Sequence, residues 1–191
     1  MSARTGMLGV ISALLLVTCL MLTGAPAMAA EISPAPDSLT STVVGDLDQL
    51  TQDEIEALRS GSPKIVTVDP YSGDVTDVEV ITEAELEATL EALTPSGPSA
   101  RSWSTGCASG KPCWHDNPPG NVHYQFTLGV TNGTWDTVRN FYTGDYYAKL
   151  CWIPWNSTTK FCMPERNGTK ALIQIGMQVT GKRVDLSKTR V

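Results

Sequence analysis

The sequence has few of the residues that enzymes use most often for acid–base chemistry at neutral pH: it contains two histidines, His115 and His123. It contains neither a G-x-S-x-G nucleophile motif nor an H-E-x-x-H zinc motif. No run of basic residues is present, which argues against nucleic acid as a partner. These absences disfavour the common hydrolase classes, and we predict no cofactor and no metal site.

The N-terminal residues predict secretion. Arg4 supplies a positive start, residues 7–22 form a nearly continuous apolar run, and Ala27-Met28-Ala29 matches an A-x-A cleavage signal. Two alternatives are a membrane anchor and lipid attachment at Cys19, but the run is short and continues past Cys19. We predict cleavage after Ala29 and an extracellular protein without a membrane span.

Charge divides the rest of the chain. Residues 30–100 hold 15 acidic and two basic residues, a net of −13, whereas residues 101–191 hold five acidic and 11 basic residues, a net of +6. Opposite charges indicate either two separate tasks or intramolecular contact between the acidic and basic halves. We predict a signal peptide over 1–29, a flexible N-terminus over 30–49, an acidic α-β-β-α pro-region or spacer over 50–93, a linker over 94–101, and a basic β domain over 102–191.

The acidic segment has the pattern of helix, hairpin, helix. Capping-box sequences over 51–54 and 82–85 predict the starts of two helices. Between them, β-rich runs over 65–68 and 75–80 flank a turn sequence. The acidic segment has few large apolar residues, so we expect it to be only marginally stable as a separate unit. Such a unit suits either a spacer or a pro-region released by cleavage near Arg101.

The basic segment has the pattern of a small β domain. Apolar and polar residues alternate over 122–130, and Asn132-Gly133 is a hairpin signal. Further strands are expected over 146–152, 161–163 and 171–179, with a turn at Thr180-Gly181-Lys182 leading to a last strand over 183–186. The predicted fold is mainly β, a disulfide-stapled Greek-key β-sandwich of about six strands.

Cysteine spacing predicts disulfides in that domain. Four cysteines follow the leader, at positions 107, 113, 151 and 162. Three pairings are open. In the local set, Cys107–Cys113 would close a loop and Cys151–Cys162 would link the two strands of a hairpin. A metal site is the rival, but these spacings do not resemble those of zinc-ligand pairs.

Candidate catalytic residues are His115, Asp116 and His123. They could supply a general base, an orienting carboxylate and a second ligand. Adjacent residues of an extended segment point to opposite faces, however, so Asp116 is poorly placed to orient His115. His123 falls on the polar face of its predicted strand, where a solvated histidine is expected.

Candidate binding residues are Trp155, Lys149, Lys160 and Tyr147. Packing alone does not explain Trp155, which lies in a turn sequence, Ile153-Pro154-Trp155-Asn156-Ser157. An aromatic side chain on a rigid loop near basic residues is typical of a binding anchor. The other tryptophans are expected to fill a thin core.

The sequence Tyr142-Thr143-Gly144, with Trp135 before it and Tyr146-Tyr147-Ala148-Lys149-Leu150-Cys151-Trp152 after it, resembles small secreted actinobacterial proteins. Some of these are similar to the βγ-crystallin-like group, which includes killer-toxin-like proteins and proteinaceous metalloprotease inhibitors. The shared feature is an aromatic-x-Gly at the corner of a Greek key. The acidic calcium loop of that group is not visible here, so the resemblance does not imply calcium binding.

Together these features predict a secreted, non-enzymatic binding protein, either inhibitor-like or like an antibacterial toxin. Its β domain is expected to recognise a protein or cell-envelope target. The alternative is a small secreted hydrolase that uses His115 and His123.

Overall fold

The computed structural model describes residues 41–93, 108, 110–116 and 123–190, all within one compact unit of the chain. The predicted signal peptide and linker, most of the predicted flexible N-terminus, and Cys107 lie outside these residues. The described residues form nine strands and two helices, which confirms a mainly β protein. The elements are β1 (Thr42–Val44), α1 (Gln52–Arg59), β2 (Lys64–Val68), β3 (Val75–Val80), α2 (Glu83–Leu93), β4 (Cys113–Asp116), β5 (His123–Gln125), β6 (Gly129–Tyr142), β7 (Tyr147–Pro154), β8 (Lys160–Cys162) and β9 (Ala171–Ser187).

Both helices begin where the capping boxes predict. The amide of Glu54 donates to the Thr51 hydroxyl at 3.3 Å, and the amide of Thr51 donates to the Glu54 carboxylate at 2.7 Å. Thr82 and Glu85 make the same reciprocal bonds at the start of α2. Each box satisfies backbone N–H groups that the first helical turn leaves unpaired.

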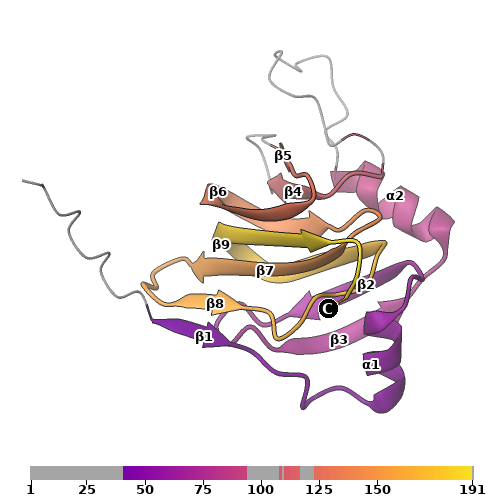
Figure 1. Cartoon of the computed structure of the whole chain (residues 1–191), viewed down its shortest axis with the longest axis horizontal. Coiled ribbons are helices and arrows are strands. Elements are labelled where there is room, and N and C mark those ends of the chain that lie inside the picture. Colours follow the sequence, from indigo (N-terminus) through magenta and orange to yellow (C-terminus); the bar gives the residue numbers. More distant parts are fainter. Residues whose placement is uncertain (1–40, 94–107, 109, 117–122, 191) are drawn as a thin grey trace, which may run out of the picture. The chain divides into compact units, whose positions relative to one another are not determined.

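The nine strands belong to one mixed sheet in which β9 has the most neighbours (Figure 1). The order is β1-β8-β7-β9-β6-β4-β5, with β2 also paired to β9 and β3 paired to β2. The first residues of β9 pair in parallel with β2, and its later residues pair antiparallel with β7. β9 therefore changes neighbours along its length, which lets one strand join the acidic and basic segments.

Two predicted turns lie inside long strands. Asn132-Gly133 is part of β6, and Thr180-Gly181-Lys182 is part of β9. Where the hairpin was expected, the β6–β9 register shifts between Asn132 and Trp135. The prediction of a hairpin there is wrong because β9 supplies a long partner, so the extra residues form a bulge instead of reversing the chain.

A common hydrophobic core unites the acidic and basic segments. Leu58 of α1, Val66 of β2 and Val75 of β3 are buried in the same cluster as Phe141 and Ile173. Trp114 and Trp152 are fully buried there, as expected for tryptophan in a small β domain. The indole N–H of Trp152 donates to the backbone oxygen of Pro70 at 2.9 Å, which adds a polar link between the segments.

Surface ion pairs also join the two segments. The Arg59 guanidinium binds the Glu165 carboxylate with two bonds, at 2.8 and 3.0 Å. Lys170 lies 3.1 Å from the carboxylate of Glu83. The acidic segment thus contacts the basic one through strand pairing, a common core and opposite charge.

The structure contains the predicted Cys151–Cys162 disulfide. It joins directly opposed residues of β7 and β8. Cys113 is disulfide-bonded as well, whereas Cys107 lies outside the described residues. Neither α1 nor α2 is long and apolar enough to cross a membrane.

Candidate functional site

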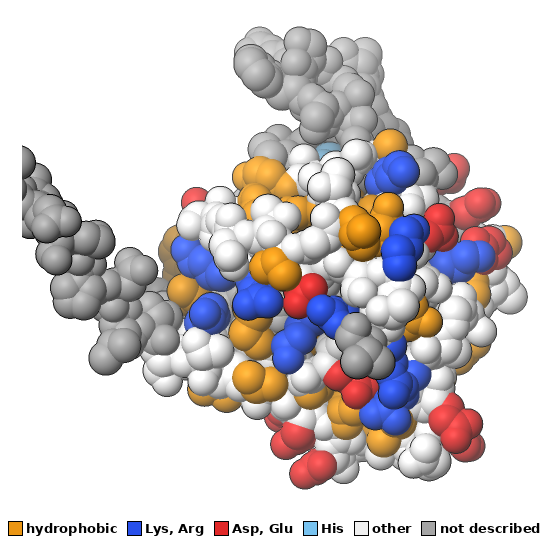
Figure 2. All heavy atoms as spheres, viewed as in Figure 1, with side chains coloured by type: hydrophobic (Ala, Val, Ile, Leu, Met, Phe, Trp, Pro, Cys, Tyr) orange, Lys and Arg blue, Asp and Glu red, His pale blue; other side chains and the backbone are white. Residues whose placement is uncertain are grey.

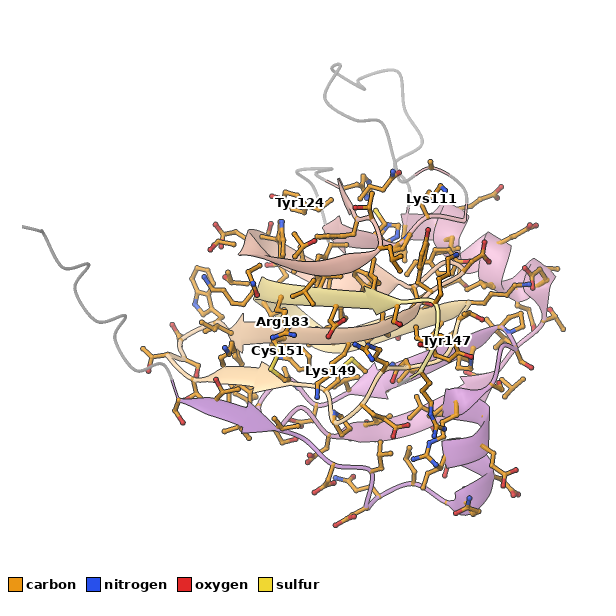
Figure 3. All side chains as sticks on the ribbon, in the orientation of Figure 1. Lys111, Tyr124, Tyr147, Lys149, Cys151 and Arg183 are labelled. Carbon is orange, nitrogen blue, oxygen red and sulfur yellow. A yellow bond between two sulfur atoms is a disulfide. The ribbon has the colours of Figure 1, made fainter. Side chains whose placement is uncertain are left out.

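The best candidate for a binding surface is the face of the sheet opposite the core on β7 and β9. Alternation points Leu150, Trp152 and Val184 into the core and places Lys149 and Arg183 on the other face. Figure 3 shows Lys149, Cys151 and Arg183 close together on the ribbon. We call this surface the basic face and define it by Val44, Val130, Tyr147, Lys149, Arg166, Arg183 and Asp185.

Sheet register gives the basic face two continuous rows. In one row, Lys149 of β7 and Val130 of β6 flank Asp185 of β9. In the other, Arg183 is followed by Cys151, Cys162 and Val44 on successive strands. Directly opposed residues share a face of a sheet, so the cations and the exposed valines form one surface.

Asp185 organises the cations of this face. Its carboxylate accepts hydrogen bonds from Nη2 of Arg166 at 3.1 and 3.3 Å and from Nη2 of Arg183 at 3.4 Å. Lys149 donates from Nζ to the backbone oxygen of Pro164 at 3.0 Å. Each side chain is thereby oriented by a contact on the surface itself.

The basic face carries surplus positive charge. Lys149, Arg166 and Arg183 surround one carboxylate, a net of +2. Burial, and then the charge of Arg183, lowers the pKa of the Lys149 ammonium, while Asp185 opposes that shift. The nearby Glu165 adds little negative charge because Arg59 binds it in a bidentate pair. An anion bound here would reduce the electrostatic repulsion among these three cations, which Asp185 neutralises only in part.

Exposed apolar side chains flank these cations. Val44 is 54% exposed and Val130 is 51% exposed. In Figure 2, Lys and Arg side chains gather over β7 and β9 with hydrophobic side chains between them. The surface is therefore amphipathic.

Trp155 is 69% exposed, in the turn between β7 and β8. That turn is closed by a bond from the Ser157 amide to the Pro154 oxygen at 3.1 Å, and Asn156 has a φ of 64°. Among the other sequence-predicted binding residues, Tyr147 and Lys149 lie two positions apart on β7 and share a face, whereas Lys160 begins β8. All three side chains are half-buried.

The two histidines lie together, away from the basic face. β4 and β5 pair His115 directly with His123, and their ring centroids are 5.1 Å apart. Both are buried, so the expectation of a solvated His123 is wrong. The strand predicted over 122–130 is interrupted after Gln125, and its first part, β5, pairs with β4 and so places His123 on the same face as His115.

Burial has a chemical consequence for His115. Loss of solvation and the neighbouring His123 lower its pKa to about 4, so the imidazole is neutral at pH 7. A general base works best with a pKa near the working pH, which makes His115 a weak one. Asp116 is the last residue of β4, after a register shift, and its side chain lies outside the described part of the structure.

His115 also lines a pocket of about 610 Å³ beside α2. The wall is acidic, with carboxylates from Glu83, Glu87, Glu91 and Asp145. Burial, and then Asp145, raises the pKa of the Tyr142 hydroxyl that lines the same space. Within the described residues, no group of three or more His, Cys, Asp or Glu side chains is arranged to hold a metal ion.

Comparison with known proteins identifies no relative: no family model, curated protein or solved structure matches this chain. The resemblance to the βγ-crystallin-like group therefore stays a prediction.

Sequence reasoning missed Arg166 and Asp185. The alternation of Arg183 and Asp185 with Val184 and Leu186 could have identified the outward side of β9. No local signal identifies Arg166, because it comes from the connection between β8 and β9 and reaches Asp185 across 19 positions of sequence.

Proposed function

We propose that the protein is a secreted, non-enzymatic binding protein that recognises a protein or cell-envelope target, as an inhibitor or an antibacterial toxin does. The observation that carries this proposal is the basic face, an exposed surface with a net charge of +2 among apolar side chains. Surfaces that combine unneutralised charge with exposed apolar groups are typical of interaction sites.

Rigidity supports the same proposal. Strand pairing fixes the basic face, and the Cys151–Cys162 disulfide lies beside Arg183 in one of its rows. A surface that is ordered before binding loses little conformational entropy on association. Trp155, on its closed turn, adds a large side chain that a target can bury.

Binding assays with the full chain test the proposal. The full chain is the appropriate bait because β9 of the basic segment pairs with β2 of the acidic one. We expect retention on cell-envelope or protein fractions to fall about 30-fold for Trp155→Ala, the loss expected for a central aromatic anchor. Tyr71→Ala is the matched control, since Tyr71 is a 54% exposed aromatic on the β2–β3 turn. If Trp155→Ala and Tyr71→Ala bind equally well, Trp155 is not part of the binding site. If the wild-type protein is not retained on any fraction, the proposed binding function is wrong.

The second candidate is a small hydrolase that uses His115 and His123. It is favoured by one observation, that His115 lines the pocket beside α2. Against it stand the low pKa of His115 and the burial of both rings. His115→Gln is expected to leave target binding unchanged, whereas turnover that disappears with this substitution on a substrate panel would favour the hydrolase.

We also propose a role for the acidic segment and a finer description of the fold. Burial of Val66 and Val75 in the common core supports a segment that stays with the mature protein as a spacer, although a pro-region remains the alternative. A Greek-key sandwich is supported by the bulges of β6, which allow a long sheet to bend over its own core.

A further inference from the structure

We propose that the basic face binds the phosphate groups of an anionic phospholipid surface, with Lys149, Arg166 and Arg183 as the headgroup-binding residues. This inference rests on the proposed function, because it names the cell-envelope component that the face recognises. It places the protein at a membrane surface.

The cations of the face retain donors for such a ligand. Among the described residues, the Arg183 side chain makes one hydrogen bond, at 3.4 Å, so most of its five N–H groups are available. Lys149 uses one of its three donors on Pro164. Arg166 contributes its Nη1 group, whose bond to the Arg190 backbone oxygen is long, at 3.4 Å.

Geometry and charge favour phosphate over carboxylate. Asp185 binds Arg166 and Arg183 through Nη2 of each, which gathers two guanidinium groups beside the ammonium of Lys149. A phosphate offers oxygens in several directions to such a set, whereas a carboxylate offers two in one plane. The surplus of +2 also exceeds what one carboxylate neutralises.

The apolar flanks favour a bilayer over a soluble phosphate polymer. Val130 lies directly across from Asp185, and Val44 ends the row that contains Arg183. Both side chains are more than half exposed on the face that carries the cations. At a membrane, the cations can bind headgroups while the valines contact the boundary with the acyl chains.

Vesicle co-sedimentation of the full chain tests this inference. The probes are vesicles of phosphatidylcholine alone and of phosphatidylcholine mixed with phosphatidylglycerol. We expect binding to the mixed vesicles only, weakened about fivefold by Arg183→Gln and about 25-fold by the double variant Lys149→Gln/Arg183→Gln, following the usual contribution of a basic residue near an anionic surface. Arg183→Lys is also expected to weaken binding, because it keeps the charge and loses the planar fork.

Matched control variants distinguish a specific headgroup site on the basic face from non-specific electrostatic attraction to an anionic surface. Lys111→Gln removes an exposed positive charge from a residue shortly before β4, well away from Lys149 in Figure 3. It is expected to leave binding unchanged, and an equal loss would overturn the proposal in favour of a diffuse field. Val130→Ser is expected to weaken the binding that survives high salt, since screening removes the electrostatic part; no effect would point to a soluble phosphate polymer and reject the bilayer.

Comparing the vesicle assay with retention on envelope fractions separates the phospholipid target from the proposed binding function. Retention on envelope fractions without binding to phosphatidylglycerol vesicles would reject the phospholipid target and leave the binding function standing. Binding to neither would overturn both. Thermal unfolding of each variant identifies any loss of binding that comes from misfolding.

Discussion

Lys64 is a fully buried cation at the first position of β2. Its Nζ donates to the backbone oxygens of Ser60 at 2.9 Å and Thr169 at 3.1 Å, which ties the end of α1 to the start of β9. Burial lowers its pKa to about 8. The charged form of Lys64 therefore destabilises the fold relative to the unfolded chain, where the ammonium is hydrated.

The free energy of unfolding should rise with pH because of Lys64. Between about pH 8 and pH 10 the unfolded chain keeps a proton that the folded chain has released, so stability increases by up to about 3 kcal/mol. Lys64→Met should lack this increase. Denaturant unfolding of both proteins across that pH range measures the difference, and parallel curves for the two proteins would contradict the prediction.

Gly168 joins two elements that are far apart in sequence. Its amide donates to the oxygen of Leu58 in α1 at 2.8 Å, just before β9 begins. A Cβ at this position would meet the backbone oxygens of Ser60 and Leu58. Backbone cannot move aside as a flexible side chain can, so the contact between α1 and the strand connection requires glycine here.

Gly168→Ala should therefore destabilise the protein by about 3 kcal/mol or more, at the upper end of overpacking costs. Gly176→Ala is the matched control, because a Cβ there meets nothing within 4 Å. Its stability should stay within about 0.5 kcal/mol of the wild type. Thermal or denaturant unfolding of both variants measures the two changes in stability. Similar losses of stability in the two variants would contradict the steric explanation.

The β7–β8 hairpin depends on its disulfide. Cys151 and Cys162 are 11 positions apart, and closing so short a loop in the unfolded chain contributes about 3 kcal/mol. The double variant Cys151→Ala/Cys162→Ala should lose about that much stability. Trp155 should become more mobile as well, which hydrogen exchange of the turn can detect. Unchanged stability would show that β1 and β9 hold the hairpin without the bond.

At the level of the molecule, apolar burial outweighs surface charge in joining the acidic and basic segments. A buried valine or leucine contributes about 1.5–3 kcal/mol, and the acidic segment buries Leu58, Val66, Val68 and Val75 in the common core. The ion pairs Arg59–Glu165 and Lys170–Glu83 are partly exposed, and such pairs contribute about 1 kcal/mol or less.

A chain cut within residues 94–101 should therefore keep both pieces associated. Size-exclusion chromatography at high salt should show them eluting together, since screening weakens the ion pairs and leaves the core intact. Separation at high salt but not at low salt would instead show that opposite charge holds the segments, as a releasable pro-region requires.

Sequence predicted best where the deciding contacts are local. The capping boxes at Thr51 and Thr82 involve residues close together in the chain, so the pattern was sufficient, whereas cysteine spacing favoured the Cys151–Cys162 bond and left two other pairings open. Asn132-Gly133 shows the limit of this approach. Its turn propensity is local, but pairing with β9 overrides it, and distant residues such as Arg183, which pairs with Asn132, supply that pairing.

By itself, then, the sequence determined a mainly β protein with two capped helices, disulfide-bonded cysteines and an exposed tryptophan in a turn. The tertiary structure decided that the acidic segment joins the same sheet, that His115 and His123 are buried as a pair, and that Arg166 meets Asp185. The physical reason is the same in each case. These features depend on which strands become neighbours, and in a sheet that choice is made by long-range pairing and burial of a common core.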